Sequence, residues 1–148
     1  MDSTATQQQT SRRKAIKAVF GTVAAALWVL ALFLEAYADG TPGIMALLGG
    51  WLTLLMDNLL GFFAWCGNFL FFVGYLMFLF GRKQSTFTRA TVLAALAFVC
   101  SFGALTIMKH IDGGTSEPVV ASVGTYVWMA SLLVLLVGSA LNLLKGSR

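Results

Sequence analysis

The sequence predicts an all-α membrane protein: a bundle of four transmembrane helices with one extra short helix before the second span. Two observations support this fold class. The 148-residue chain is 58% hydrophobic and 11% charged, with a mean hydropathy of +0.82, whereas charged residues make up about 25% of a typical soluble domain. Its apolar runs are continuous rather than alternating, and a helix satisfies its own backbone hydrogen bonds inside a bilayer. We expect a single domain over residues 13–148.

The chain begins with a polar segment that precedes the first apolar run. Residues 1–12 include three consecutive glutamines and predict a disordered tail. The first span covers about residues 15–36, which is too long for the apolar part of a signal peptide, so we expect an uncleaved anchor. Gly21 and Ala25 lie four residues apart on this span, a spacing that lets two helix backbones approach closely. Two glycines and a proline within residues 39–43 predict a turn.

The distribution of basic residues determines how the next segment is interpreted. Residues 44–81 contain a single charge and are long enough for one span or barely two, since one span needs about 20 residues. A single crossing places nine of the ten basic residues on one side of the membrane and five of the six acids on the other. Short loops rich in Lys and Arg stay cytoplasmic, so both termini and the predicted tail are expected there. The nine residues are Arg12, Arg13, Lys14, Lys17, Arg82, Lys83, Arg89, Lys145 and Arg148.

We therefore predict that residues 61–81 form the second span and that residues 44–56 form a short helix that does not cross. The short helix has a bulky apolar face and a small, mildly polar face. These faces consist of Ile44, Leu47, Leu48, Trp51, Leu52 and Leu55, and of Ala46, Gly49, Gly50, Thr53 and Asp57. Both an interfacial helix and a re-entrant segment fit this pattern, and we favour the interfacial position.

The third and fourth spans are predicted over about residues 88–108 and 123–144, joined by a polar, flexible loop at 109–118. The second span carries three glycines at seven-residue intervals, which places them on one stripe and indicates a groove for a neighbouring helix. We name five candidate packing positions in this part of the chain. They are Gly67, Gly74, Gly81, Trp51 and Trp65.

No residue pattern indicates catalysis or metal binding. His110 is the only histidine, and Cys66 and Cys100 lie far apart in the sequence, so no pair has the spacing of metal ligands or of a redox motif. Neither G-x-S-x-G nor H-E-x-x-H occurs. We predict that the protein is not an enzyme and has no cofactor. The basic residues flank the spans instead of alternating with aromatic residues, so we expect no nucleic-acid binding.

Polar residues near or inside the spans are the candidate functional positions, because such residues are rare in membranes. They are Glu35, Asp57, Asn58 and Asn68. Asn68 is the most interesting because it lies inside the second span. For this residue we favour an interhelical hydrogen bond, worth about 0.6 kcal/mol, over a direct role in function.

The stretch GGWLTLLMDNLLGFFAWCGNFLFFVGYL, from Gly49 to Leu76, resembles a segment of small uncharacterised bacterial four-helix inner-membrane proteins. Those proteins show a Gly-Trp or Gly-Pro pair, then a Gly-x-Phe-Ala-Trp-like patch, and then an Asn before an apolar helix. This chain has Phe69 where the family often has proline. The resemblance implies a location in the bacterial inner membrane and points to Trp51, Trp65 and Asn68, but it implies no activity.

Two functions fit these observations. The first is a non-enzymatic protein that packs against a membrane partner, as an accessory subunit, a regulator or an immunity protein. Its expected contact regions are Ile44–Asn58 and the loop 109–118. The alternative is an oligomeric channel or small transporter with a path near Gly49–Asn58. Besides the lipid bilayer, the expected partner is another membrane protein or a parallel homo-oligomer, since the biased charge distribution argues against a dual-topology dimer.

Overall fold

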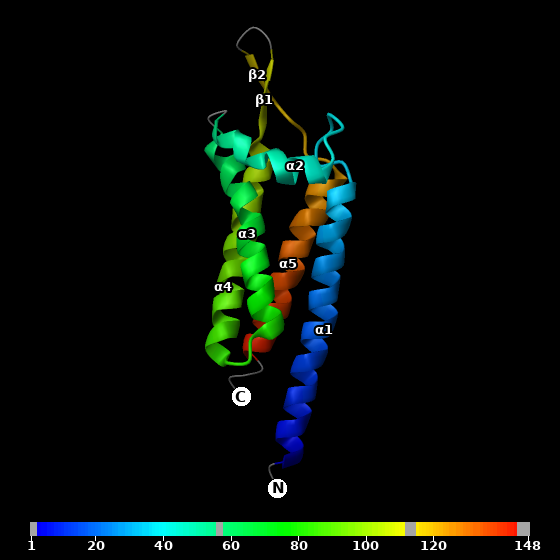
Figure 1. Ribbon diagram of the computed structural model, residues 1–148, viewed down its shortest axis with the longest axis vertical. Helices are drawn as coiled ribbons and strands as arrows, with labels where there is room; N and C mark the ends of the chain where they lie inside the picture. Colours follow the sequence, from blue (N-terminus) through cyan, green and yellow to red (C-terminus); the bar gives the residue numbers. More distant parts are fainter. Residues whose placement is uncertain (1–2, 56–57, 112–114, 145–148) are drawn as a thin grey trace.

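The computed structural model describes residues 3–55, 58–111 and 115–144, and it confirms the predicted fold class. Four helical segments are long and apolar enough to cross a membrane, and they run side by side (Figure 1). They are α1 (Ser3–Phe33), α3 (Leu59–Phe80), α4 (Gln84–Ser101) continued by the 3-10 helix η2 (Phe102–Thr106), and α5 (Val123–Leu144). The chain is therefore a multi-pass membrane protein by the length and composition of its helices.

The short helix between the first two spans is also present, as α2 (Gly43–Gly49) and the 3-10 helix η1 (Gly50–Leu54). It lies crosswise at one end of the bundle and does not run between the long helices (Figure 1). The predicted short helix before the second span is therefore confirmed. Leu48 and Leu52 on the bulky face are exposed. Leu47 of that face and Ala46 of the small face are half-buried and line a cavity of the bundle.

The first helix is longer than the sequence indicates. It begins at Ser3, where a disordered tail over residues 1–12 was expected, and it extends beyond the other helices (Figure 1). Once the apolar span has nucleated a helix, each added residue gains a backbone hydrogen bond, and Ala, Gln, Arg and Lys are good helix formers. At its other end α1 stops at Phe33, three residues before the predicted boundary, because residues 34–43 turn back toward α2.

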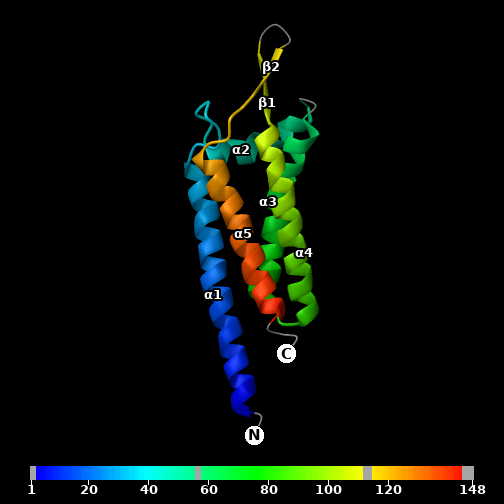
Figure 2. The same ribbon diagram turned by 180° about the vertical axis from the view of Figure 1, so that it is seen from behind.

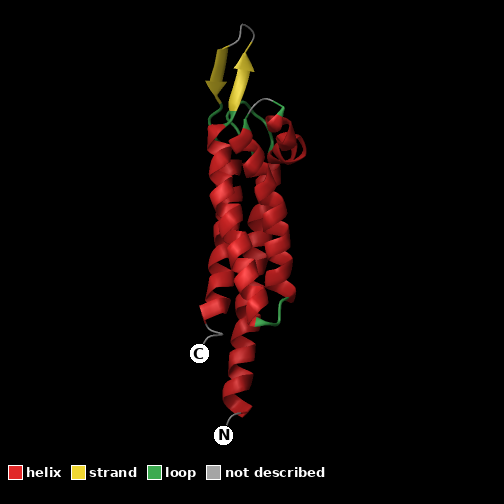
Figure 3. Ribbon diagram, turned by 90° about the vertical axis from the view of Figure 1, so that its left-hand side faces the viewer, coloured by secondary structure: helices red, strands yellow, loops and turns green. Residues whose placement is uncertain are grey.

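The residues between the third and fourth spans form a β-hairpin where a flexible loop was expected. Strands β1 (Met108–Ile111) and β2 (Thr115–Pro118) pair antiparallel, with Lys109 opposite Glu117 and His110 opposite Ser116. The hairpin projects beyond the helices (Figure 3). The sequence between the strands, Asp-Gly-Gly, is a common hairpin signal that the polar composition of the segment obscured. We call this the hairpin end of the bundle, and the opposite end, where α1 begins and α5 finishes, the termini end.

Helices α1, α5, α4 and α3 follow one another around the bundle, each packed closely on the next, whereas α1 and α3 contact each other only sparsely (Figure 2). Small residues make the close contacts possible. A Cβ added at Gly67 would lie 3.3 Å from the carbonyl oxygen of Ala97, and one at Gly74 would lie 3.4 Å from Leu93 Cβ. These two predicted packing glycines therefore serve the α3–α4 interface inside the chain.

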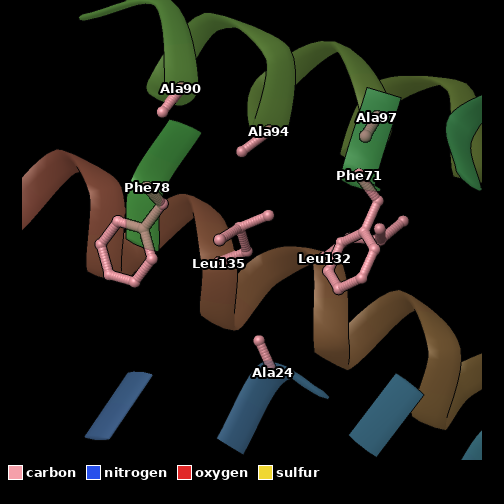
Figure 4. Close-up of a cluster of buried hydrophobic side chains, with 8 residues drawn as sticks. All are labelled: Ala24, Phe71, Phe78, Ala90, Ala94, Ala97, Leu132 and Leu135. Atoms are coloured by element: carbon pink, nitrogen blue, oxygen red, sulfur yellow. The ribbon is translucent and has the colours of Figure 1, made fainter. Parts of the chain in front are cut away.

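The core lies where the small residues of α4 meet the large side chains of α3 and α5 (Figure 4). Phe71 and Phe78 fill the centre, Leu132 and Leu135 approach from α5, and Ala24 closes the α1 side. Lipid tails are as apolar as these side chains, so the gain comes from close packing rather than from leaving water. The remaining members are Ala90, Ala94 and Ala97.

Replacing Gly74 with leucine should separate α3 from α4, because the space beside this glycine has no room for more than a methyl group. We expect a loss of about 1–3 kcal/mol in the free energy of unfolding, measured by denaturation in detergent. Val73→Leu is the control, since Val73 is 46% exposed on the outer surface of the same helix. Equal stability of both variants would contradict this account of the α3–α4 interface.

Candidate functional site

Backbone hydrogen bonds tie the connecting segments of the hairpin end to each other. The carbonyl oxygen of Ala36 accepts a hydrogen bond from the amide of Ser122 at 2.8 Å and from the buried hydroxyl of Thr125 at 2.6 Å. The amide of Ala38 donates to Val120 O at 2.9 Å, and that of Gly124 donates to Glu35 O at 2.8 Å. The segment after α1 is thus fixed to the segment before α5, and the two form one rigid surface.

A cavity of about 80 Å³ lies beneath α2–η1, between this surface and the first turns of α3 and α5. It has room for two or three water molecules at about 30 Å³ each. Its polar lining comes from tryptophan indoles, one amide, one phenol and two threonines. These residues are Trp28, Trp65, Trp128, Asn68, Tyr37, Thr53 and Thr125, and small residues such as Ala46, Gly50, Ala64 and Gly124 complete the wall.

Asn68 is the centre of the polar contacts in this cavity. Its Oδ1 accepts a hydrogen bond from Trp28 Nε1 of α1 at 3.2 Å and another from Trp128 Nε1 of α5 at 3.0 Å. An indole N–H can only donate, so the atom between the two rings must be the amide oxygen. Asn68 Nδ2 donates to Trp65 O at 3.1 Å, which leaves its second N–H without a partner among the described residues. One buried amide therefore joins three helices.

Trp65 attaches the short helix to α3. Its Nε1 donates to Leu47 O at 2.7 Å, one of the carbonyl groups near the end of α2 that have no partner within the helix. Gly50 lies against the same indole, where a Cβ would be 2.5 Å from Trp65 Cδ1. Only glycine at this position lets η1 approach the ring so closely. The contact therefore holds the short helix α2–η1 over the cavity.

Tyr37 contributes a neutral phenol to the cavity wall. Burial, and secondarily the charge of Asp39, raise the pKa of Tyr37 to about 12. The raised pKa means that the folded state favours the protonated form, so the hydroxyl remains a hydrogen-bond donor at physiological pH. All three indole N–H groups already have acceptors, so the polar groups still open in this cavity include the second N–H of Asn68 and the hydroxyl of Tyr37. Water suits such groups because it both donates and accepts hydrogen bonds.

The structure brings together only some of the residues that the sequence singles out. Asn68 and Trp65 belong to the cavity, whereas Trp51 points outward with 47% of its surface exposed. Asn58 caps α3, accepting from Gly61 N at 2.8 Å and donating to Thr106 O at 3.2 Å. Glu35 is exposed beside the turn after α1.

Two further candidate positions have other outcomes. Gly81 ends α3, and its amide donates to Met77 O at 2.9 Å, so it marks the turn into α4 rather than a groove. Asp57 lies outside the described residues. Cys66 and Cys100 are both free thiols, and the described residues include no group of three or more His, Cys, Asp or Glu placed to hold a metal ion.

Sequence reasoning missed the two tryptophans that donate to Asn68. The indole N–H of Trp128 points inward, to Asn68 Oδ1. Depth was the signal that could have found this pair. Trp28 lies five residues before the end of α1 and Trp128 five residues after the start of α5, so at 1.5 Å per residue both are about 8 Å inside the bundle. A buried indole N–H at that depth requires an acceptor.

No family model matches the chain, and no curated protein or solved structure shows significant similarity to it. The resemblance over Gly49–Leu76 therefore stays a prediction. Function has to be inferred from the residues themselves and from the way the fold places them.

Replacing Asn68 with leucine should leave the indoles of Trp28 and Trp128 without an acceptor. We expect a loss of about 1–3 kcal/mol in the free energy of unfolding, measured by denaturation in detergent. Asn142→Leu is the matched control, because Asn142 bonds only Gly138 O of its own helix and its buried Oδ1 has no partner. An Asn142→Leu variant that loses as much stability as Asn68→Leu would show that the interhelical bonds carry no special weight.

Replacing Gly50 with valine should push η1 away from Trp65 and open the cavity. Amide hydrogens between residues 44 and 54 should then exchange faster with deuterium, while those of the long helices keep their rates. Gly49→Val is the control, because a Cβ at Gly49 would meet nothing closer than 4.0 Å. If both variants exchange alike, the Gly50–Trp65 contact does not hold the short helix in place.

Proposed function

We propose that this multi-pass membrane protein acts without enzymatic chemistry, by binding a partner protein at its hairpin end. Accessory subunits, regulators and immunity proteins work in this way. The observation that supports the proposal is the β1–β2 hairpin, which stands clear of the helices, pairs only with itself among the described residues and rises from a rigid base (Figure 1).

An isolated two-stranded hairpin is only marginally stable in water, and each of its strands has one edge with unpaired backbone groups. A partner that adds a strand to such an edge satisfies these groups and gains main-chain hydrogen bonds. Here the hairpin is closed at its base, where Val119 N donates to Ile107 O at 2.9 Å. Val120 in turn accepts from Ala38, so the hairpin is attached to the surface that covers the cavity. Its direction is therefore set by the bundle.

The sides of the bundle give less support for a partner that packs along the helices. Gly67 and Gly74 are covered by α4 inside the chain, so this predicted groove is already occupied. Large side chains, such as Phe69, Val73 and Leu76 on α3, form the surface that remains. Such a surface suits contact with lipid tails, whereas close helix–helix contacts in membranes use small residues.

A path for a solute through one copy of the chain also receives less support. The cavity beneath Gly50 ends at Asn68 and Trp28. Beyond them, Trp28 stacks on Phe71 with ring centroids 6.3 Å apart, and Phe78 is fully buried further along the core. These aromatic rings fill the interior among the described residues.

We further propose that the hairpin end faces away from the cytoplasm of a bacterium, with the protein in its inner membrane. The support is the asymmetry of charge. Arg12 to Lys17 on α1 and the turn with Arg82 and Lys83 lie at the termini end. Basic residues next to membrane spans are retained in the cytoplasm. The hairpin would then meet a partner in the periplasm or in the outer half of the membrane.

The test replaces Met108–Pro118 with the dipeptide Asn-Gly. Ile107 and Val119 already make the hydrogen bond that flanks a two-residue turn, so the bundle should keep its thermal stability. In living cells, a photocrosslinking residue at position 109 or 110 should give a protein adduct, because neighbouring strand residues face opposite sides. The same residue at Phe72, which is 41% exposed on α3, should give none.

The outcomes separate the alternatives. The proposal is supported if adducts form at the hairpin and behave differently toward two competitors. An excess of the full chain should reduce these adducts, and an excess of the hairpin-less variant should not. An adduct of twice the mass of the chain would identify a second copy and contradict a distinct partner. Adducts at Phe72 without any at the hairpin would place the partner against the helices and also contradict it.

A further inference from the structure

An open cleft of about 600 Å³ lies at the termini end, between the N-terminal half of α1, the end of α3 and the start of α4. Four cationic side chains line it together with apolar ones. The cations are Arg13, Lys14, Lys17 and Arg82, and the apolar residues are Leu79, Phe80 and Phe87. The segments that line the cleft, the N-terminal half of α1 and the turn between α3 and α4, lie at the opposite end of the long helices from the hairpin (Figure 1).

The positive charges of this cleft have no carboxylate partner among the described residues. The acidic residues that the structure describes are Glu35, Asp39 and Glu117, and all of them lie at the hairpin end. Four cations gathered at one cleft repel each other, so an anion that binds between them relieves this repulsion. Exclusion from water along the apolar wall strengthens the attraction.

Lys17 and Arg13 are held in place by contacts that leave donors unused. Lys17 Nζ donates to Leu79 O at 3.0 Å and to Gly81 O at 2.5 Å, which are carbonyl groups at the end of α3. Both cations lie over the ring of Phe87, with Lys17 Nζ 5.0 Å and Arg13 Cζ 5.7 Å from its centroid. Arg13 Nη2 donates to Gln84 Oε1 at 3.4 Å, whereas Arg13 Nε is buried and has no partner.

We propose that this cleft binds the phosphate group of an anionic membrane lipid. A guanidinium group matches two phosphate oxygens at once, and Arg13 lines the cleft with a single hydrogen bond to another described residue. The cleft lies where the apolar helix α3 ends at Phe80, which is the level of the lipid headgroups. Phe80 is 75% exposed beside the cations, so it can contact the glycerol and the upper acyl chain while the phosphate is held. Basic pockets between transmembrane helices bind such headgroups.

Binding of single lipids to the full chain in detergent, followed by native mass spectrometry, tests the proposal. Phosphatidylglycerol and phosphatidylcholine with the same acyl chains are compared. We expect the full chain to prefer the anionic lipid, and we expect the Arg13→Gln, Arg82→Gln double variant to lose about 25-fold in affinity for it, at about five-fold for each charge. The matched control is the double variant Arg12→Gln, Lys83→Gln, which removes the same charge from the same end outside the cleft.

An unchanged preference in the control supports the cleft, and an equal loss in both double variants overturns it in favour of diffuse attraction to the basic end. Arg82→Gln alone guards against misfolding, because Arg82 is exposed. Its expected loss is about five-fold, and no loss at all would overturn the proposal. A separate arm adds inorganic phosphate. If about 1 mM phosphate removes the preference for phosphatidylglycerol at constant ionic strength, the ligand is a free phosphate and the lipid assignment fails; persistence of the preference supports the lipid.

Discussion

Inside the hydrocarbon of a membrane no water completes the hydrogen bonds of a polar group, and the polar contacts of this bundle follow from that constraint. The side-chain oxygen of Asn68 accepts hydrogen bonds from two indoles on other helices. Lys17 satisfies carbonyl groups that the end of α3 leaves open. Ser101 and Ser131 each bond a carbonyl oxygen one turn back on their own helix. Polar side chains of the bundle thus join helices or bond within one, and Asn68 and Lys17, which join helices, also line the cavity at the hairpin end and the cleft at the termini end.

The size of side chains explains where the cavities occur. Small residues bring α1 to α5, α5 to α4 and α4 to α3, and these contacts leave little space. Between α1 and α3 the contact is made by long side chains, with the ring of Trp28 4.8 Å from that of Phe72 at one level and Gly21 facing Leu79 at another. Two helices held apart by aromatic rings leave space above and below those rings. The cavity around Asn68 lies on the hairpin side of these rings, and the basic cleft lies on the side of the termini end.

Composition and charge were sufficient to predict the spans, because a bilayer leaves few alternatives to a helix. The charge distribution also placed the short helix before α3, since a second crossing would have moved Arg82 and Lys83 to the acidic side. The β-hairpin and the pairing of Trp28 with Asn68 were not predicted. The pairing of Trp28 with Asn68 depends on a contact between residues far apart in the sequence, and the hairpin depends on turn residues within a polar segment. Hydropathy detects neither feature. The helical start of α1 depends on propagation of the helix from the apolar span. The polar composition of residues 1–12 alone predicted disorder.

The separation of the two ends has a consequence for how their roles combine. Sites more than about 10 Å apart with no shared partners usually act additively, and the buried rings of Phe71 and Phe78 lie between the hairpin end and the basic cleft. A phosphate held by Arg13 would fix the depth of α1 and α3 in the bilayer without altering the hydrogen bonds around Ala36 and Val120. Because the helices between the two ends are rigidly packed, fixing one end in the headgroup layer also fixes the height at which the hairpin stands. Lipid binding at the termini end and the height of the hairpin above the membrane would then be linked by the packed helices alone, and no conformational change has to pass through the core.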